Sequence, residues 1–107
     1  MRYDYVSAGF YTFDCLGWPF EAVPPGGGTK LIREITMAVS GAAGTAAIVG
    51  AKLGLKTLAV GGYGRDMMGD WALARLEALG VDTSGLQRFA DVPTSSLIVL
   101  TRADGTR

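Results

Sequence analysis

Histidine is absent from this 107-residue sequence, and cysteine occurs only once, at Cys15. The absence of histidine excludes a Ser-His-Asp catalytic triad and removes the most common protein ligand of transition metals. A single cysteine excludes an internal disulfide and is typical of a reducing compartment, so we expect a cytoplasmic protein. The 10 basic residues balance the 10 acidic residues. No excess of positive charge therefore indicates nucleic acid as a partner.

Long apolar runs are also missing. The longest uncharged run, from Ile35 to Ala51, is too short and too rich in small and hydroxyl residues for a membrane span. The amino terminus has Arg2 but then Asp4 and Asp14, and it lacks the apolar segment of a signal peptide. Because the chain is neutral and 49% hydrophobic, it predicts one folded domain that does not contact membranes and that favours self-association.

Glycine, by contrast, is abundant, and it punctuates the central part of the chain. Residues from Ala42 to Leu53 are almost all small or aliphatic and precede Gly54, which predicts a helix that ends at that glycine. The short aliphatic run from Lys56 to Val60 predicts one buried parallel strand. We expect this strand to stop at the glycines that follow it, which are Gly61, Gly62 and Gly64.

A second helix is predicted to begin after Asp66, which is a favourable N-cap, and to end before Gly80. The order of helix, strand and helix is typical of an α/β fold. In such folds ligands bind beyond the carboxyl ends of the strands.

The residues before this unit predict a strand and a hairpin. Aromatic and β-branched residues from Tyr3 to Phe13 indicate a first strand, interrupted near Gly9, with Asp14 at its carboxyl end. Runs from Leu16 to Val23 and from Leu31 to Val39 indicate two strands joined by a glycine-rich loop. On the residues alone, Asp14 either caps a turn or binds a ligand.

The last part of the chain predicts two further strands. A turn over residues 80–85 precedes a short strand from Leu86 to Phe89. The segment from Ser96 to Thr101 contains a buried strand over residues 97–100, and Asp104-Gly105 indicates a hairpin turn after it.

Two glycine-rich stretches resemble nucleotide-binding motifs but lack the required spacing. The stretch from Pro24 to Lys30 ends in lysine, yet it has neither the spacing of a P-loop nor a helix after it, so a flexible connection is favoured. A dinucleotide fingerprint that starts at Gly62 would need glycine at position 67, where Met67 stands. The sequence therefore disfavours a nicotinamide-binding domain.

Three blocks in succession resemble the amino-terminal part of the PfkB (ribokinase-like) carbohydrate and nucleoside kinases. They are SGAAGTAAIVGAKLG, which starts at Ser40, then VGGYGRDMMGD, then LEALGVDTSGL. The resemblance implies an α/β ribokinase-like sandwich with a small β-sheet lid, of which residues 1–107 are only the amino-terminal fragment. It places an α/β core at about residues 3–14 and 41–90, and lid strands at about 16–40 and 95–107.

The same resemblance implies an acceptor site. Asp14 corresponds to the aspartate of the family that accepts hydrogen bonds from sugar hydroxyls. The segment from Ser40 to Thr45 corresponds to a Gly-Gly-x-x-x-Asn motif, so Ser40, Gly41, Ala42 and Thr45 are candidate substrate-binding residues. Here Ser40 replaces a glycine and Thr45 replaces the asparagine, which shortens the reach of that side chain. Gly64 is expected to form a tight turn near the pocket.

The resemblance further implies an ATP-dependent kinase that phosphorylates a hydroxyl group of a sugar or nucleoside. By this resemblance, the catalytic aspartate of the family lies in a Gly-x-Gly-Asp motif near the carboxyl end, and the nucleotide pocket and the Mg²⁺ contacts lie in the same half of the protein. That motif is absent from these residues. We therefore expect no catalytic residue here, and a fragment that is inactive alone. The alternative is a non-catalytic binding or dimerisation module that forms a homodimer through the lid.

Overall fold

The computed structural model describes residues 2–107, which form six strands and two helices. Neither helix in these residues is long and apolar enough to cross a bilayer. The elements in chain order are β1 (Tyr5–Ala8), β2 (Thr12–Trp18), β3 (Glu34–Ser40), α1 (Ala42–Lys52), β4 (Thr57–Gly64), α2 (Met67–Ala78), β5 (Asp82–Phe89) and β6 (Ser96–Leu100).

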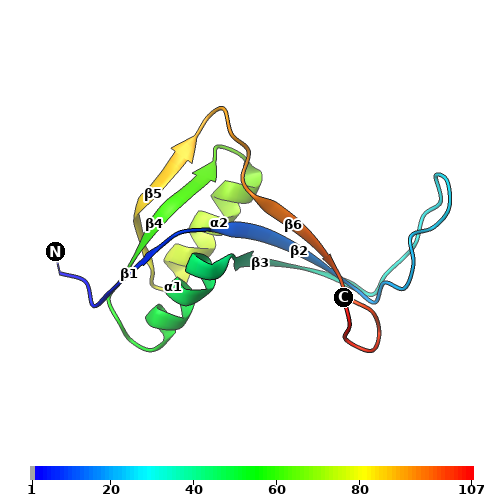
Figure 1. Cartoon of the computed structure of the whole chain (residues 1–107), viewed down its shortest axis with the longest axis horizontal. Coiled ribbons are helices and arrows are strands. Elements are labelled where there is room, and N and C mark those ends of the chain that lie inside the picture. Colours follow the sequence, from blue (N-terminus) through cyan, green and yellow to red (C-terminus); the bar gives the residue numbers. More distant parts are fainter. Residues whose placement is uncertain (1) are drawn as a thin grey trace.

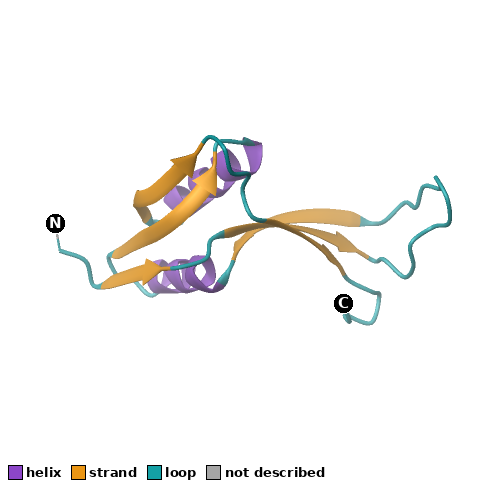
Figure 2. Ribbon diagram, turned by 45° about the horizontal axis from the view of Figure 1, so that its top comes forward, coloured by secondary structure: helices purple, strands orange, loops and turns teal. Residues whose placement is uncertain are grey.

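The strands divide into two sheets of three strands each. The first sheet has the order β1-β4-β5 with all strands parallel, and the two helices lie against it (Figure 1). The second sheet has the order β3-β2-β6, in which β2 is antiparallel to β3 and parallel to β6. It extends away from the first sheet as a single layer and ends in the long loop of residues 19–33 (Figure 2).

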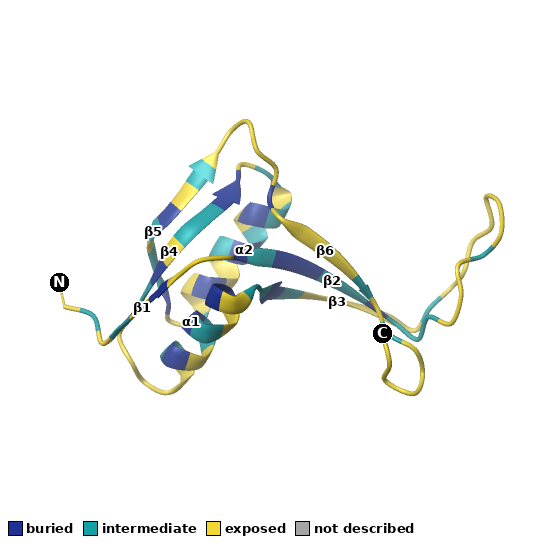
Figure 3. Ribbon diagram, viewed as in Figure 1, coloured by how far each residue is buried: buried dark blue, intermediate teal, exposed yellow. Residues whose placement is uncertain are grey.

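The core lies between the first sheet and the two helices, where small side chains let the backbones approach closely. Ala47 and Ala59 are fully buried, and Leu76 of α2 packs in the same cluster (Figure 3). A Cβ atom at Gly50 would lie 2.9 Å from the ring of Tyr5, so glycine is what allows α1 to lie this close to β1. The small side chains of α1 therefore allow this helix to pack closely against the first sheet.

Tyr63 places a hydroxyl inside this core. The side chain is 1% exposed, and its ring packs edge-to-face with that of Tyr11, with 6.1 Å between the ring centroids. Burial raises the pKa of its hydroxyl well above the ordinary value. The Tyr11 hydroxyl donates to the Ser7 carbonyl, whereas the Tyr63 hydroxyl has no hydrogen-bond partner within residues 2–107.

We expect Tyr63→Phe to leave the free energy of unfolding unchanged or to raise it by about 1 kcal/mol, because it removes a buried hydroxyl that lacks a partner. Urea unfolding of the two proteins would measure this. Tyr11→Phe is the matched control and should be destabilising, because it removes the hydrogen bond from the Tyr11 hydroxyl to the Ser7 carbonyl. A clear loss of stability in Tyr63→Phe would contradict the interpretation.

The helix predictions are confirmed. Helix α1 follows Gly41 and precedes Gly54, whose φ of 85° is favourable for glycine. Helix α2 has Asp66 as its N-cap, and the Asp66 side chain accepts a hydrogen bond from the Gly69 amide at 2.8 Å.

The boundaries predicted around Asp14 are wrong. The first strand stops at Ala8, and Gly9 with φ 143° turns the chain out of the first sheet. Strand β2 then starts at Thr12 and ends at Trp18, so the strand predicted from Leu16 to Val23 is shifted. Asp14 therefore lies within β2 of the second sheet instead of after the first strand.

The prediction that β4 stops at its glycines is also wrong, because the strand continues to Gly64. These glycines provide space for close neighbours. A Cβ atom at Gly61 would lie 2.7 Å from the ring of Tyr11, and one at Gly62 would overlap the ring of Phe89. Glycine within a strand here marks a close approach and leaves the strand unbroken.

Two further differences concern β5 and β6. Strand β5 begins at Asp82, inside the segment predicted as a turn. Strand β6 is found as predicted, but it is not buried, since Ile98 is 78% exposed and Leu97 is 52% exposed. The reason is that no helix within residues 2–107 covers either face of β6 in the second sheet (Figure 3).

Candidate functional site

A cleft of about 210 Å³ lies where the carboxyl ends of β4 and β5 meet the passage into β6. Its lining includes Phe10, Gly64 and Phe89, together with Pro93 and Ser95 of the passage. The end of a parallel sheet is the place where α/β proteins bind ligands. Gly64, the last residue of β4, lies at this cleft.

The start of α1 lies against the turn that follows β1. Gly41 has φ 83° and ψ 152°, and a Cβ atom on it would lie 2.5 Å from the Phe10 carbonyl oxygen. That oxygen accepts hydrogen bonds from the amides of Ala43 and Gly44, both at 3.2 Å. Two of the four amides at the helix start are therefore bound within the protein, and those of Gly41 and Ala42 are the other two.

Asp14 lies on the central strand of the second sheet and is 9% exposed. Its partners across the sheet are Ala38 and Leu97, so these three side chains share one face. We call this the acceptor face. Thr12 and Ser40 pair on the same face, and the Thr12 hydroxyl donates to the Asp14 carboxylate at 3.2 Å.

The predicted site residues fall into two neighbouring groups. Asp14 and Ser40 lie on the acceptor face, and Gly41 and Ala42 follow Ser40 directly. Thr45 is exposed on the first turn of α1. Gly64 lies in the cleft, whose lining contains none of the other five residues. Phe10 connects the groups, because it lines the cleft and its carbonyl accepts hydrogen bonds from the amides of Ala43 and Gly44 at the start of α1.

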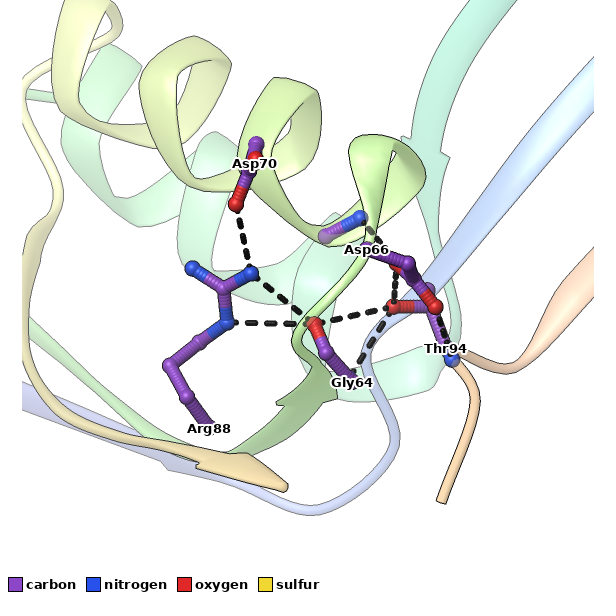
Figure 4. A network of polar contacts seen from close by, with 6 residues as sticks. Gly64, Asp66, Asp70, Arg88 and Thr94 are labelled. Carbon is purple, nitrogen blue, oxygen red and sulfur yellow. Dashed lines mark hydrogen bonds and ion pairs between the residues drawn. The ribbon is translucent and has the colours of Figure 1, made fainter. Parts of the chain in front are cut away.

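A polar network next to Gly64 was not predicted from the sequence (Figure 4). Asp66 accepts hydrogen bonds from the Thr94 hydroxyl at 2.6 Å and from the Thr94 amide at 2.8 Å. Arg88 donates to the Gly64 carbonyl at 2.9 Å and forms an ion pair with Asp70 at 2.6 Å. The Thr94 hydroxyl is the main cause that lowers the pKa of Asp66, followed by the amides of Thr94 and Gly69.

Only the helix-capping part of this network could be predicted from the sequence. The Gly-x-Asp spacing predicts the helix cap, but nothing near Asp66 in the sequence points to Thr94 or Arg88, which lie far along the chain.

The opposite face of the second sheet is apolar. Cys15, Ile35, Met37, Ile98 and Leu100 share it with Phe13, and we call it the apolar face. It continues into a groove of about 470 Å³ that Phe13 and Met37 line together with Met67, Met68 and Trp71 of α2. The rings of Trp71 and Phe13 pack edge-to-face, with 5.6 Å between their centroids.

No group of three or more acidic or cysteine side chains within residues 2–107 converges so that it could hold a metal ion.

Comparisons with known proteins agree with this architecture. The family model of the pfkB family carbohydrate kinases matches residues 18–107. A curated nucleoside kinase from Methanothermobacter thermautotrophicus is 32% identical over 101 residues, which cover 94% of this chain and 32% of the relative.

Solved structures show the same likeness. The ribokinase of Arabidopsis thaliana, complexed with ribose and ATP, superposes with a TM-score of 0.84 at 26% identity, over 98% of this chain and 34% of that chain. The ribokinase of Cryptococcus neoformans var. grubii serotype A, in complex with ADP, has a TM-score of 0.75 at 27% identity, over 94% of this chain and 31% of that chain.

The chain spans about a third of the length of these relatives. Their match to nearly all of it, with the α/β sheet, the second sheet and the ordered glycine motifs, confirms the resemblance drawn from the sequence. The chain belongs to the pfkB family of carbohydrate kinases.

Proposed function

We propose that the protein containing this chain uses ATP to phosphorylate a hydroxyl group of a sugar or nucleoside, and that this chain supplies the acceptor-binding part. In this reaction the acceptor oxygen forms a bond to the γ-phosphorus, the bond from that phosphorus to the β–γ bridging oxygen breaks, and ADP leaves. The names of the relatives support this chemistry: one is a nucleoside kinase, and one was solved with ribose and ATP.

The observation that carries the proposal is the placement of Asp14. It is a buried carboxylate on the acceptor face, which also carries Ser40, and Ser40 directly precedes Gly41 and the start of α1. A carboxylate accepts hydrogen bonds from the hydroxyl groups of a sugar, and the amides of Gly41 and Ala42 would donate to its oxygens. A buried acceptor opposed by donors is what a polyhydroxyl ligand requires.

The other candidate residues take lesser parts in this proposal. Thr45 would contribute a hydroxyl from the first turn of α1, where its side chain is exposed. Gly64 would take part through the backbone at the end of β4, because the backbone of residues 92–94 fills the place of a side chain there. The second sheet would serve as the lid over the acceptor.

ATP, Mg²⁺ and the base that removes the hydroxyl proton are proposed to bind or lie outside these residues. Residues 2–107 contain no group of three or more acidic or cysteine side chains that could hold a metal ion, and the sequence has no Gly-x-Gly-Asp motif. The single cysteine leads us to propose a cytoplasmic protein.

The test is to incubate the complete protein with MgATP and a panel of sugars and nucleosides and to measure ADP formation. We expect at least one acceptor to raise ADP formation well above the rate with water alone. If no acceptor does so while the protein is folded and binds ATP, the proposed kinase activity is wrong.

The apolar face favours a second function, which is assembly of two copies. It presents Ile35 at 65% and Ile98 at 78% exposure, on a sheet whose outer strands β3 and β6 have no further partner within residues 2–107. Burial of such side chains stabilises an interface at about 25 cal/mol per Å² before the costs of association. We propose a homodimer in which the apolar faces of two lids contact each other.

If this dimer forms, Ile98→Lys should weaken it by about tenfold or more, because it buries a charge in the interface. Sedimentation velocity over a concentration series would measure the change. Leu97→Lys is the matched control, since Leu97 belongs to the acceptor face. Dimers that persist in Ile98→Lys, or that dissociate equally in both variants, would contradict assembly through the apolar face.

A further inference from the structure

Asp66 makes more hydrogen bonds than a helix cap needs. Capping of α2 uses one carboxylate oxygen, Oδ1, which accepts from the Gly69 amide at 2.8 Å. The same oxygen also accepts from the Thr94 hydroxyl at 2.6 Å, and Oδ2 accepts from the Thr94 amide at 2.8 Å. Two of these three bonds therefore hold a residue that lies far from the helix in sequence.

Thr94 is held from a second side as well. The Gly64 amide donates to its hydroxyl at 3.0 Å, and Thr94 is 5% exposed. A Cβ atom at Gly64 would lie 2.5 Å from the Thr94 amide nitrogen, so the end of β4 and the Thr94 backbone are in direct contact. The end of β4, the start of α2 and Thr94 are thus joined at one point (Figure 4).

Thr94 lies in one of the three segments through which the chain passes between the two sheets. The chain passes from β1 to β2 through residues 9–11, from β3 to α1 through Gly41, and from β5 to β6 through residues 90–95. Thr94 lies in the third passage, two residues before β6. From there the Ser95 carbonyl accepts the Phe13 amide at 2.9 Å, and Leu97 pairs with Asp14.

We infer that Asp66 is a positioning residue that fixes the second sheet on the first by anchoring Thr94. The inference rests on the proposed function in so far as the sheet that it fixes carries Asp14. The carboxylate acts through Thr94, β6 and β2 and has no contact with the acceptor. Arg88 supports the anchor, because it donates to the Gly64 carbonyl while it pairs with Asp70.

The variants that test this separate the cap from the anchor. Asp66→Asn keeps an oxygen for the Gly69 amide, but its NH₂ group would face the Thr94 amide, where two donors repel. Thr94→Val keeps the shape of the side chain and removes the hydroxyl, whereas Thr94→Ser retains the hydroxyl. Thr83→Val is the matched control, because the Thr83 hydroxyl donates to Glu77 at an exposed site away from the second sheet.

In the complete protein, Asp66→Asn and Thr94→Val should raise KM for the acceptor by about tenfold and change KM for MgATP by less than about twofold. Amide hydrogen exchange of residues 96–100 should become about tenfold faster, while exchange of residues 57–63 stays unchanged. Thr94→Ser and Thr83→Val should resemble the wild type in both measurements.

Hydrogen exchange needs no substrate, so it tests the anchor even if the wild type phosphorylates nothing. Unchanged exchange in residues 96–100 of both Asp66→Asn and Thr94→Val would show that Asp66 only caps α2. Equally faster exchange in α2, β4 and β6 would show general destabilisation and would also overturn the inference. Failure of the wild type to turn over any acceptor would instead overturn the proposed function.

Discussion

Asp14→Asn in the complete protein is expected to lower kcat/KM for the acceptor by about 100-fold, because hydrogen bonds to a charged acceptor contribute about 1.5–3 kcal/mol each. Asparagine has nearly the same size, so the fold should persist. Its NH₂ group, however, is a hydrogen-bond donor and cannot accept the hydrogen bonds that the acceptor hydroxyl groups would donate to the carboxylate. Steady-state kinetics with a varied acceptor concentration would measure the loss, and KM for MgATP should stay within about twofold.

The matched control is Asp104→Asn in the exposed turn after β6, where Asp104 accepts hydrogen bonds from the amide and hydroxyl of Thr106. It removes the same charge from the same part of the chain and should leave acceptor kinetics unchanged. Should Asp14→Asn retain the wild-type kcat/KM, Asp14 would not belong to the acceptor site. The buried carboxylate would then serve the second sheet alone.

Gly41→Ala is expected to lower the free energy of unfolding by about 3–5 kcal/mol, which is at the upper end for a single substitution. Two costs combine at this position. A backbone with φ 83° and ψ 152° is essentially restricted to glycine and costs alanine about 1–3 kcal/mol, and the new methyl group would lie 2.5 Å from the Phe10 carbonyl oxygen. That oxygen cannot move freely, because it already receives the amides of Ala43 and Gly44.

Gly54→Ala separates these two costs. Gly54 follows the other end of α1 with φ 85°, and a Cβ atom on it would have no neighbour within 4 Å. This variant should therefore lose only about 1 kcal/mol, from backbone conformation alone. Urea unfolding of both variants would measure the difference. Equal losses would mean that the contact with Phe10 has no energetic weight and that only the backbone angle matters.

Elements with local signals could be predicted from the sequence. Helix α2 has its N-cap at Asp66 and a glycine at position 80, and α1 has Gly54 two residues after its end, so each helix is marked by its own neighbours. The boundary between β1 and β2 had weaker marks. The aromatic and β-branched pattern continues through it, and only Gly9 interrupts the pattern.

Features that depend on distant partners could not be predicted. The β4 glycines resemble strand breakers until the rings of Tyr11 and Phe89 are placed beside them. The exposure of β6 depends on which elements cover it, and its sequence is as apolar as that of a buried strand. Within the site, Asp14 and Ser40 share a face because of strand register, whereas Thr94 reaches Asp66 only through the fold.

The parallel pairing of β2 with β6 has a consequence for the order of folding. The β2–β3 hairpin closes a local loop, but β6 can join β2 only after β4, α2 and β5 have brought residues 90–95 to the correct place. Pairing over such a long stretch of chain is entropically costly and slow. We therefore expect β6 to dock last, and the free edge of β2 to be the site where newly synthesised chains associate wrongly.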